Sequence, residues 1–411
     1  MNIFLVHQYF LEKDEGGGSR FNEITVHWAD ENHKITVLAG MINYATGKKN
    51  EKYKNKFIRQ ETYNKHIHVI RCHVSEAYNK NFLGRLYAYF SFVFSGIIAV
   101  IFKVTGKYDV VIATSPPLFV GIIGYFFSRM KRIPLVFEVR DLWPESAIDT
   151  RVLKNSFLIR LSYRFEKFIY NKASLIIVLT PAFRDNLIQL KRVPENKIRI
   201  VPNAADLSIS EKVMNRFDRN KFRDTMGWDN KVVFIYVGAH GVANHLIQVL
   251  EVAELLTETN AHFVLIGDGM QKPVLVKYAL QKKLTNVEFL DPVPKQKIFE
   301  YIAASDAGIS VLKKSDTFKT IYSNKTFDYM ACKRPVIMVI DGISRKLIEE
   351  ARGGIYVEPE NIPDFKEKIM LYLREPKRMV QEGNNGYDYV KKNFDRKKLS
   401  KKYLVCIQEI I

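Results

Sequence analysis

Residues 109–139 read DVVIATSPPLFVGIIGYFFSRMKRIPLVFEV, and this stretch decides the fold class. Two short apolar runs, 109–114 and 134–139, flank a segment that has the length and apolar content of a helix. A helix that connects two buried strands is the usual crossover of a parallel sheet. The stretch therefore predicts one strand, helix, strand unit.

The same alternation continues on both sides of this unit. Further apolar runs precede and follow it, at 2–7, 34–39, 66–71, 174–180 and 197–203. After a polar pause at 203–230, a second series follows at 231–238, 262–267, 286–290, 307–312, 334–340 and 353–357. We expect an α/β protein with two doubly wound, Rossmann-like domains, 1–204 and 205–387, and a helix over 388–411 that returns to the first domain.

Composition and charge narrow the class of protein. Of 411 residues, 47% are hydrophobic and 26% are charged, which excludes disordered, collagen-like and coiled-coil chains. The formal net charge is +19, and residues 1–200 hold 30 basic and 17 acidic residues, a difference of 13. We expect the first domain to face an anionic partner.

The cysteines and the first residues indicate the compartment. Cys72, Cys332 and Cys406 lie far apart without any CxxC pair, so neither a disulfide framework nor a zinc site is expected. The opening run MNIFLVHQYF has no basic segment before it and predicts a strand rather than a signal peptide. A reducing cytoplasm is the expected compartment.

Residues 86–102 contain 17 residues without a charge. A helix of that length spans about 25 Å, less than the roughly 30 Å of a hydrocarbon core. Because the strands before and after it belong to one predicted sheet, we reject a membrane crossing. It is either a core helix, in which case replacing Phe90, Phe92 and Phe94 unfolds the chain, or a helix that lies in the membrane surface. Aromatic and basic residues favour the second: Arg85, Tyr89, Phe90, Phe94, Lys103, Lys107, Arg129, Lys131 and Arg132.

Ligands of doubly wound domains bind beyond the carboxyl ends of the strands, so the loops there are informative. The loop after the first run holds Gly16, Gly17 and Gly18 and then Arg20, which suits an anion at a helix start. It is not GxGxxG, and no Walker loop occurs, so neither a dinucleotide cofactor nor ATP hydrolysis is indicated.

Two more loops carry polar or glycine-rich sequence. The run at 134–139 is followed by Arg140, Asp141, Trp143 and Glu145. They form either a polar site with a stacking wall or a salt bridge, of Arg140 with Asp141 or with Glu145, that shapes the loop. The loop at 236–245 contains two glycines before a helix and offers backbone amides to an anion.

Residues 323–337, SNKTFDYMACKRPVI, resemble a segment of the retaining glycosyltransferases of family 4, which have two facing Rossmann-like domains called GT-B. Other segments agree in the same order: the first glycine-rich loop, RDLWPES at 140–146, VPNAAD at 201–206, YVGAHG at 236–241 and IGDG at 266–269. The resemblance covers nearly the whole chain. It implies a GT-B fold with a cleft between the domains.

The resemblance also implies roles for single residues. Lys325 would neutralise the donor diphosphate, and Asp328 would bind the ribose hydroxyls, where the family usually has Glu. Thr320 stands where the family has another Glu. The residues implied in donor binding are Gly17, Gly18, Arg20, Gly238, His240, Gly241, Asn244, Gly267, Asp268, Ser323, Asn324, Lys325 and Asp328.

The subgroup that the chain most resembles moves an N-acetylated amino sugar, N-acetyl-L-fucosamine, from UDP to a polyprenyl-diphosphate-linked sugar in capsule or O-antigen synthesis. No D-x-D pair occurs, so no metal and no further cofactor is expected. Asp141, then Glu145, would orient the acceptor hydroxyl or the sugar, and Arg140 would hold the acceptor diphosphate. The resemblance places the chain peripherally on the cytoplasmic face of a bacterial membrane.

Three other functions remain open. A UDP-sugar 2-epimerase also has paired Rossmann-like domains, but the run at 323–337 argues against it. A non-catalytic membrane-bound GT-B scaffold is compatible with Thr320 and Asp328. A nucleic-acid binder is disfavoured, because the aromatic residues cluster in one apolar run instead of alternating with Lys and Arg.

Overall fold

The computed structural model describes residues 1–12, 15, 20–43, 46–79, 82–149 and 153–411. The chain divides into two units. Unit 1 holds residues 1–12, 20–202 and 397–411, and unit 2 holds Glu15 and residues 203–396.

Unit 1 is built on one sheet, in the order β3-β4-β2-β1-β5-β6-β7-β8. The strands are β1 (Asn2–Val6), β2 (Lys34–Gly40), β3 (Ile58–Asn64), β4 (Ile67–Cys72), β5 (Val110–Ser115), β6 (Leu135–Val139), β7 (Leu175–Val178) and β8 (Ile198–Ile200). All neighbouring pairs are parallel except β3 with β4. The strand order reverses between β1 and β5, which is where doubly wound folds bind ligands.

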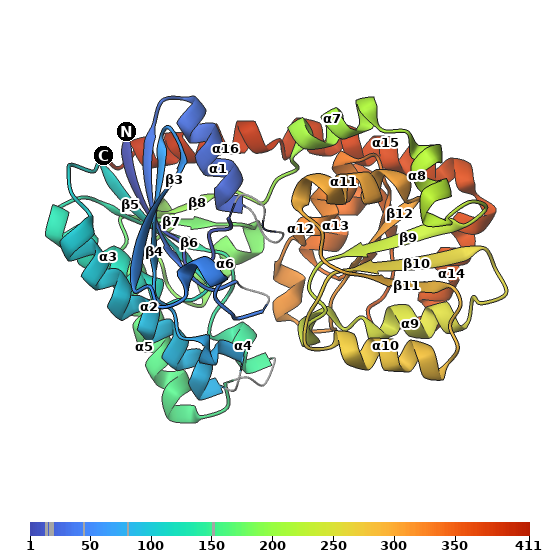
Figure 1. Ribbon diagram of the computed structural model, residues 1–411, viewed down its shortest axis with the longest axis horizontal. Helices are drawn as coiled ribbons and strands as arrows, with labels where there is room; N and C mark the ends of the chain where they lie inside the picture. Colours follow the sequence, from blue (N-terminus) through green and yellow to red (C-terminus); the bar gives the residue numbers. More distant parts are fainter. Residues whose placement is uncertain (13–14, 16–19, 44–45, 80–81, 150–152) are drawn as a thin grey trace. The chain divides into compact units, whose positions relative to one another are not determined.

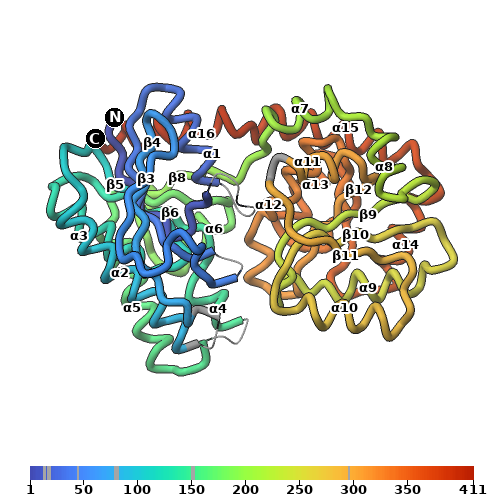
Figure 2. The backbone as a smooth tube through the Cα atoms, in the orientation of Figure 1, coloured from blue at the N-terminus to red at the C-terminus, as the bar shows by residue number. Residues whose placement is uncertain are grey.

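Helices cover both faces of this sheet (Figure 1). Those of unit 1 are α1 (Arg20–Asp30), α2 (Phe82–Lys103), α3 (Val120–Lys131), α4 (Glu145–Asp149), α5 (Ser156–Lys172), α6 (Pro181–Gln189) and α16 (Arg396–Gln408). Helices α2, α3 and α5 lie side by side on one face. Helix α16 lies beside α1 on the other face (Figure 2), where Trp28 Nε1 donates to the Ser400 carbonyl at 3.0 Å. The last helix thus completes the core of unit 1.

Unit 2 repeats the arrangement with the order β11-β10-β9-β12-β13-β14, entirely parallel. Its strands are β9 (Val232–Val237), β10 (Ala261–Ile266), β11 (Val287–Leu290), β12 (Ala307–Val311), β13 (Val336–Val339) and β14 (Gly354–Tyr356). Its helices are α7 (Leu207–Arg216), α8 (Arg219–Met226), α9 (Ile247–Glu254), α10 (Lys272–Gln281), α11 (Lys295–Ala304), α12 (Asn324–Ala331), α13 (Ile343–Ala351), α14 (Ile362–Arg374) and α15 (Pro376–Asn393). The order reverses between β9 and β12.

The element bounds refine the expected divisions of the chain. The expected boundary at 387/388 falls inside α15, and the chain passes from unit 2 to unit 1 at Arg396. The polar pause at 203–230 contains α7 and α8.

The apolar run at 86–102 lies within α2. Helix α2 is long and apolar enough to cross a membrane by length and composition, and 39% of its most apolar window is buried in the protein. Strands on both sides of α2 in the sequence pair with each other, since β1 lies between β2 and β5. This pairing agrees with the rejection of a crossing.

Candidate functional site

Helix α12 carries the SNKTFDYMA run and is seated by its buried residues. The Tyr329 hydroxyl accepts from Val237 N on β9 at 2.9 Å and lies 3.3 Å from the Ile309 carbonyl of β12. Thr326 Oγ1 and Ser310 Oγ share a hydrogen bond of 2.7 Å. The motif therefore fixes α12 against both strands of the switch point, and its remaining residues, Lys325 among them, are less buried.

Lys325 is a cation enclosed by unit 2. Its Nζ lies 4.9 Å from the centre of the Tyr236 ring and 3.4 Å from Ser323 Oγ. Burial lowers the pKa of Lys325 to about 8, and Asp328 opposes that shift. Among the described residues, no carboxylate forms an ion pair with Lys325. The side chain is thus placed to take an anion from outside unit 2.

The loop after β9 passes directly beside Lys325. A Cβ at Gly238, which has φ +147°, would lie 3.3 Å from Lys325 Cε. Glycine at 238 lets the lysine and the loop backbone approach one anion together. Nearby, Asn244 N donates to the Gly241 carbonyl at 3.1 Å.

Gly267 packs against the backbone of the loop after β9. Its φ is +149°, and a Cβ there would lie 1.9 Å from the Gly238 carbonyl oxygen. The sequence suggested a contact with the donor, whereas the structure explains this glycine by the packing of the two loops against each other.

We expect Gly267→Ala to destabilise unit 2 by about 2 to 4 kcal/mol, because the methyl group meets backbone in a conformation that L residues avoid. Thermal unfolding with and without UDP measures the loss. Gly227→Ala is the control: its φ is +64° with nothing within 4 Å of the added Cβ, so we expect about 1 kcal/mol. Equal losses for both variants would contradict the packing role.

His240 is placed differently from the expectation. The imidazole is fully buried between the rings of Tyr236 and Phe289, and neither ring nitrogen has a hydrogen-bond partner among the described residues. Burial lowers the pKa of His240 to about 4, so the ring is neutral. Its backbone N donates to the Asp268 carbonyl at 2.8 Å. His240 is therefore a neutral ring packed between two aromatic residues, and its backbone shapes the loop.

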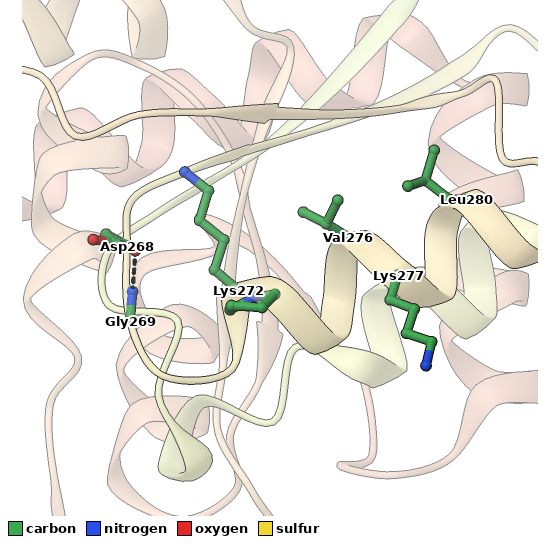
Figure 3. A pocket seen from close by; sticks show the side chains of 7 residues that line it. Asp268, Gly269, Lys272, Val276, Lys277 and Leu280 are labelled. Carbon is green, nitrogen blue, oxygen red and sulfur yellow. Dashed lines mark hydrogen bonds between the residues drawn. The ribbon is translucent and has the colours of Figure 1, made fainter. Parts of the chain in front are cut away.

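Asp268 begins the loop that leads into α10. Its Oδ1 accepts from Gly269 N at 2.7 Å (Figure 3). Lys272 Nζ donates to the Gly267 carbonyl at 2.9 Å. A hollow of about 480 Å³ lies along α10 and is lined by Asp268, Gly269, Lys272, Pro273, Val276, Lys277 and Leu280. Lys325 does not line this hollow, so we do not assign the donor diphosphate to it.

The remaining motif residues lie at the start of α12. Ser323 is buried and precedes the helix, Asn324 is exposed, and Asp328 is partly buried one turn beyond Lys325. Thr320 donates from Oγ1 to the Thr317 carbonyl at 2.6 Å. The predicted Gly17 and Gly18 lie outside the described residues.

In unit 1, polar residues gather where the strand order reverses. His7 Nδ1 and Thr114 Oγ1 are 2.8 Å apart, across the ends of β1 and β5. Burial lowers the pKa of His7, and three nearby guanidinium groups lower it further: those of Arg140, Arg71 and Arg20. Three guanidinium groups thus lie near the point where the strand order of unit 1 reverses.

Arg20, which was expected at the donor phosphate, instead binds other residues of unit 1. Its Nε and Nη2 bind the two carboxylate oxygens of Glu138 at 3.0 and 3.2 Å. It also donates to the carbonyls of Val201 and Pro202. Both side chains are fully buried, so Arg20 holds the strand ends together and we no longer assign it to the donor.

The loop after β6 separates the two predicted carboxylates. Ser146 Oγ donates to Asp141 Oδ2 at 2.7 Å, and burial raises the pKa of Asp141. Glu145 instead forms an ion pair with Lys191, which removes it from the catalytic candidates. Arg140 lies 4.0 Å from Glu138, so neither salt bridge suggested by the spacing explains the loop.

Helices α2, α3 and α5 present apolar side chains to solvent, which we call the exposed apolar face. On α2 they recur every three or four residues from Leu83 to Phe94, and Ile101 and Phe102 follow near the end of the helix. The members of the face are Leu83, Tyr87, Phe90, Phe94, Ile101, Phe102, Met130, Phe157, Leu161 and Phe168. Phe92, by contrast, is fully buried. Tyr89 packs on Phe119 at 6.0 Å between ring centres.

Basic residues accompany this face. The acidic residue within the three helices is Glu166, which is buried. The basic ones are Arg85, Lys103, Arg129, Lys131, Arg160, Arg164, Lys167 and Lys172, and Arg132 caps α3. Sequence reasoning missed α5, although apolar residues at 157, 161, 165 and 168 alternate with basic ones there. It also missed Tyr236 and Lys191, whose roles depend on residues distant in the sequence.

Two family models match this chain. A glycosyl transferase 4-like domain matches residues 15–204, and a glycosyl transferases group 1 domain matches residues 231–375. The two matches correspond to unit 1 and unit 2 and together cover most of the chain.

Known proteins agree with these models. A probable glycosyltransferase of Pseudomonas aeruginosa, WbjE, is 25% identical over 222 residues, which is 53% of this chain and 54% of that protein. The putative colanic acid biosynthesis glycosyl transferase WcaI of Escherichia coli K12 is 20% identical over 94% of this chain and 95% of its own. The structure of Anabaena Alr3699/HepE in complex with UDP-glucose superposes with a TM-score of 0.71 at 16% identity, over the full length of both chains. The chain therefore belongs to the glycosyltransferases of the GT-B fold, with a 4-like first unit and a group 1 second unit.

Proposed function

We propose that this chain is a retaining glycosyltransferase that moves an N-acetylated amino sugar, first of all N-acetyl-L-fucosamine, from UDP to a polyprenyl-diphosphate-linked sugar. The observation that carries the proposal is the enclosed ammonium of Lys325 beside the Gly238 backbone, with no carboxylate paired to it in the described part of the chain. Such a site fits a diphosphate. HepE, which shares the fold, was crystallised with UDP-glucose.

The proposed chemistry follows from where charge develops. When the bond between the sugar and the diphosphate breaks, negative charge grows on the leaving UDP, and Lys325 stabilises it together with the amides of the loop at Gly238. The leaving phosphate oxygen takes the acceptor proton, so no protein nucleophile is needed. Asp141 in unit 1 orients the acceptor hydroxyl, and Arg140 holds the acceptor diphosphate.

The acceptor side of the proposal rests on the exposed apolar face. Aromatic side chains over a basic set of helices, whose acidic residue Glu166 is buried, suit an anionic leaflet that holds a polyprenyl diphosphate. We therefore propose that unit 1 docks on the cytoplasmic face of the membrane. The name of the Escherichia coli relative refers to colanic acid, which supports a role in the synthesis of a surface polysaccharide such as a capsule or O-antigen.

The test is a transfer assay. The purified chain is incubated with a panel of UDP-sugars and a short-chain prenyl-diphosphate sugar, and the products are identified by mass spectrometry and by the anomeric configuration of the new bond. A product that retains the donor configuration supports the proposal. UDP-sugar converted without acceptor would favour an epimerase, and no conversion of any donor would contradict transfer.

Lys325 also predicts a pH dependence of UDP binding. Without UDP, the pKa of Lys325 in the protein is lowered to about 8. A bound diphosphate raises this pKa, so UDP binding above pH 8 takes up a proton. We expect the Kd for UDP to be flat from pH 7 to about 8 and to rise up to about tenfold per pH unit above it. The second pKa of a phosphate, about 6, lies below this range.

Calorimetry between pH 7 and 9.5 measures this dependence. Lys325→Arg is the control, because a guanidinium stays charged throughout that range. We expect its Kd to stay flat. A wild-type Kd that is equally flat would show that the ammonium does not meet the diphosphate.

A further inference from the structure

We propose that Lys191 is a positioning residue of the acceptor site, because it fixes the loop after β6 to helix α5. The proposal rests on the proposed function, in which unit 1 binds the acceptor. Lys191 follows the end of α6 and reaches two other elements of unit 1 at once.

The geometry is that of a cation shared by two carboxylates. Lys191 Nζ binds Glu145 of α4 and lies 2.8 Å from Glu166 Oε2 of α5. It also lies 4.3 Å from the centre of the Tyr163 ring. The side chains of Lys191 and Glu166 are 12% and 2% exposed, so solvent screens their attraction little.

Burial raises the pKa of Glu166 to about 7, and the charge of Lys191 opposes that shift. The ammonium is therefore what keeps two neighbouring carboxylates close together. Without it, burial drives Glu166 to its protonated form. Glu145, at the start of α4, then loses its charged link to α5.

An aromatic cluster ties the same loop to the same helices. Trp143 packs edge-on against Phe119 at 5.8 Å, and Phe119 stacks on Phe165 of α5 at 5.6 Å. Phe119 also contacts Phe90 of α2 at 4.8 Å. The loop that carries Arg140 and Asp141 is thus held by a charged link on one side and an aromatic link on the other.

This arrangement gives Glu145 a role that its place in the sequence did not show. Its carboxylate forms the ion pair through which Lys191 fixes the loop. Asp141, four residues earlier, stays hydrogen-bonded to Ser146 within the same turn. A loop released at Glu145 misplaces Asp141 and Arg140 together, and displacements of about 1 Å cost up to about 100-fold in rate.

The test compares Lys191→Met, Lys191→Arg and the double variant E166Q/K191M. In the double variant, position 166 no longer carries a carboxylate that can be buried without a partner. We therefore expect the double variant to fold even where Lys191→Met alone does not. We expect the acceptor KM to rise by about 10-fold to about 100-fold in both Met variants, with the donor KM within about twofold of wild type. Lys191→Arg is expected to restore most of the acceptor affinity.

A second readout does not require activity. The chain has three tryptophans, Trp28, Trp143 and Trp228, so fluorine NMR of 5-fluorotryptophan-labelled protein gives three resonances. We expect the Met variants to shift or broaden the Trp143 resonance and to leave those of Trp28 and Trp228 in place. Arg184→Met is the control: Arg184 lies on α6, shortly before Lys191, and the variant breaks its exposed ion pair with Glu195, which lies beyond the end of that helix.

The outcomes separate the two proposals. An unchanged Trp143 resonance, or donor and acceptor KM values that rise together, would overturn the role of Lys191. A wild-type chain that transfers no sugar would instead contradict the proposed function, and the Trp143 resonance would still decide whether Lys191 fixes the loop.

Discussion

Replacing Lys325 with Met is expected to lower kcat by about 100-fold to about 1000-fold, the usual effect of removing one preorganised group that faces developing charge. The ammonium is already enclosed, 4.9 Å from the Tyr236 ring centre and 3.4 Å from Ser323 Oγ. It needs no reorganisation when the diphosphate leaves. Methionine keeps the length and the apolar stem but removes the charge, so the fold of α12 is retained.

The measurement is kcat and KM for the donor, together with calorimetric binding of UDP. Lys333→Met is the matched control: it lies just beyond the same helix, is exposed, and stacks over Tyr387 at 5.0 Å. We expect the control to stay within about twofold of wild type. A loss of less than about threefold in Lys325→Met would refute the assignment of the diphosphate.

Much of the fold could be predicted because buried parallel strands are continuous apolar runs. Each of the thirteen predicted runs overlaps a strand of the structure. The strand that was missed is β3, which lies at the edge of the sheet and exposes Arg59 and Gln60. An edge strand needs no apolar run, so its sequence, IRQETYN, resembles a loop.

The candidate site could be predicted only in part. The motif at 323–337 located α12 and Lys325, because one short segment holds both the buried residues that pack α12 on the sheet and the charged Lys325. Three site residues were predicted from their neighbours in sequence, but they contact other residues of the fold. Arg20 pairs with Glu138, Glu145 pairs with Lys191, and His240 packs against the rings of Tyr236 and Phe289. A charged side chain near a strand end can bind a ligand or the protein itself, and only the tertiary structure decides which.

The exposed apolar face leads to the second large effect. We expect replacement of Leu83, Tyr87 and Phe94 by Ser to weaken binding to vesicles with anionic lipid by about 1000-fold. These side chains are 70%, 64% and 64% exposed, so the substitutions cost the fold little. Withdrawing three large apolar groups from the membrane interface removes about 4 kcal/mol of binding free energy. Phe92 is excluded because it is core, and its replacement reports on folding.

Co-sedimentation with vesicles of 30% anionic lipid, at low and physiological salt, measures this effect, with the lipid fraction chosen as roughly that of an anionic bacterial leaflet. The matched control replaces Val274, Leu280 and Val380 of unit 2 by Ser; they are 58%, 73% and 66% exposed, and none of them lies on unit 1. Far-UV circular dichroism and thermal unfolding show whether both variants are folded, because these measurements report on unit 1 as well as on unit 2. Equal sedimentation of the two variants would mean that exposure alone, and not the basic helices of unit 1, accounts for the face, and membrane docking would have to be abandoned.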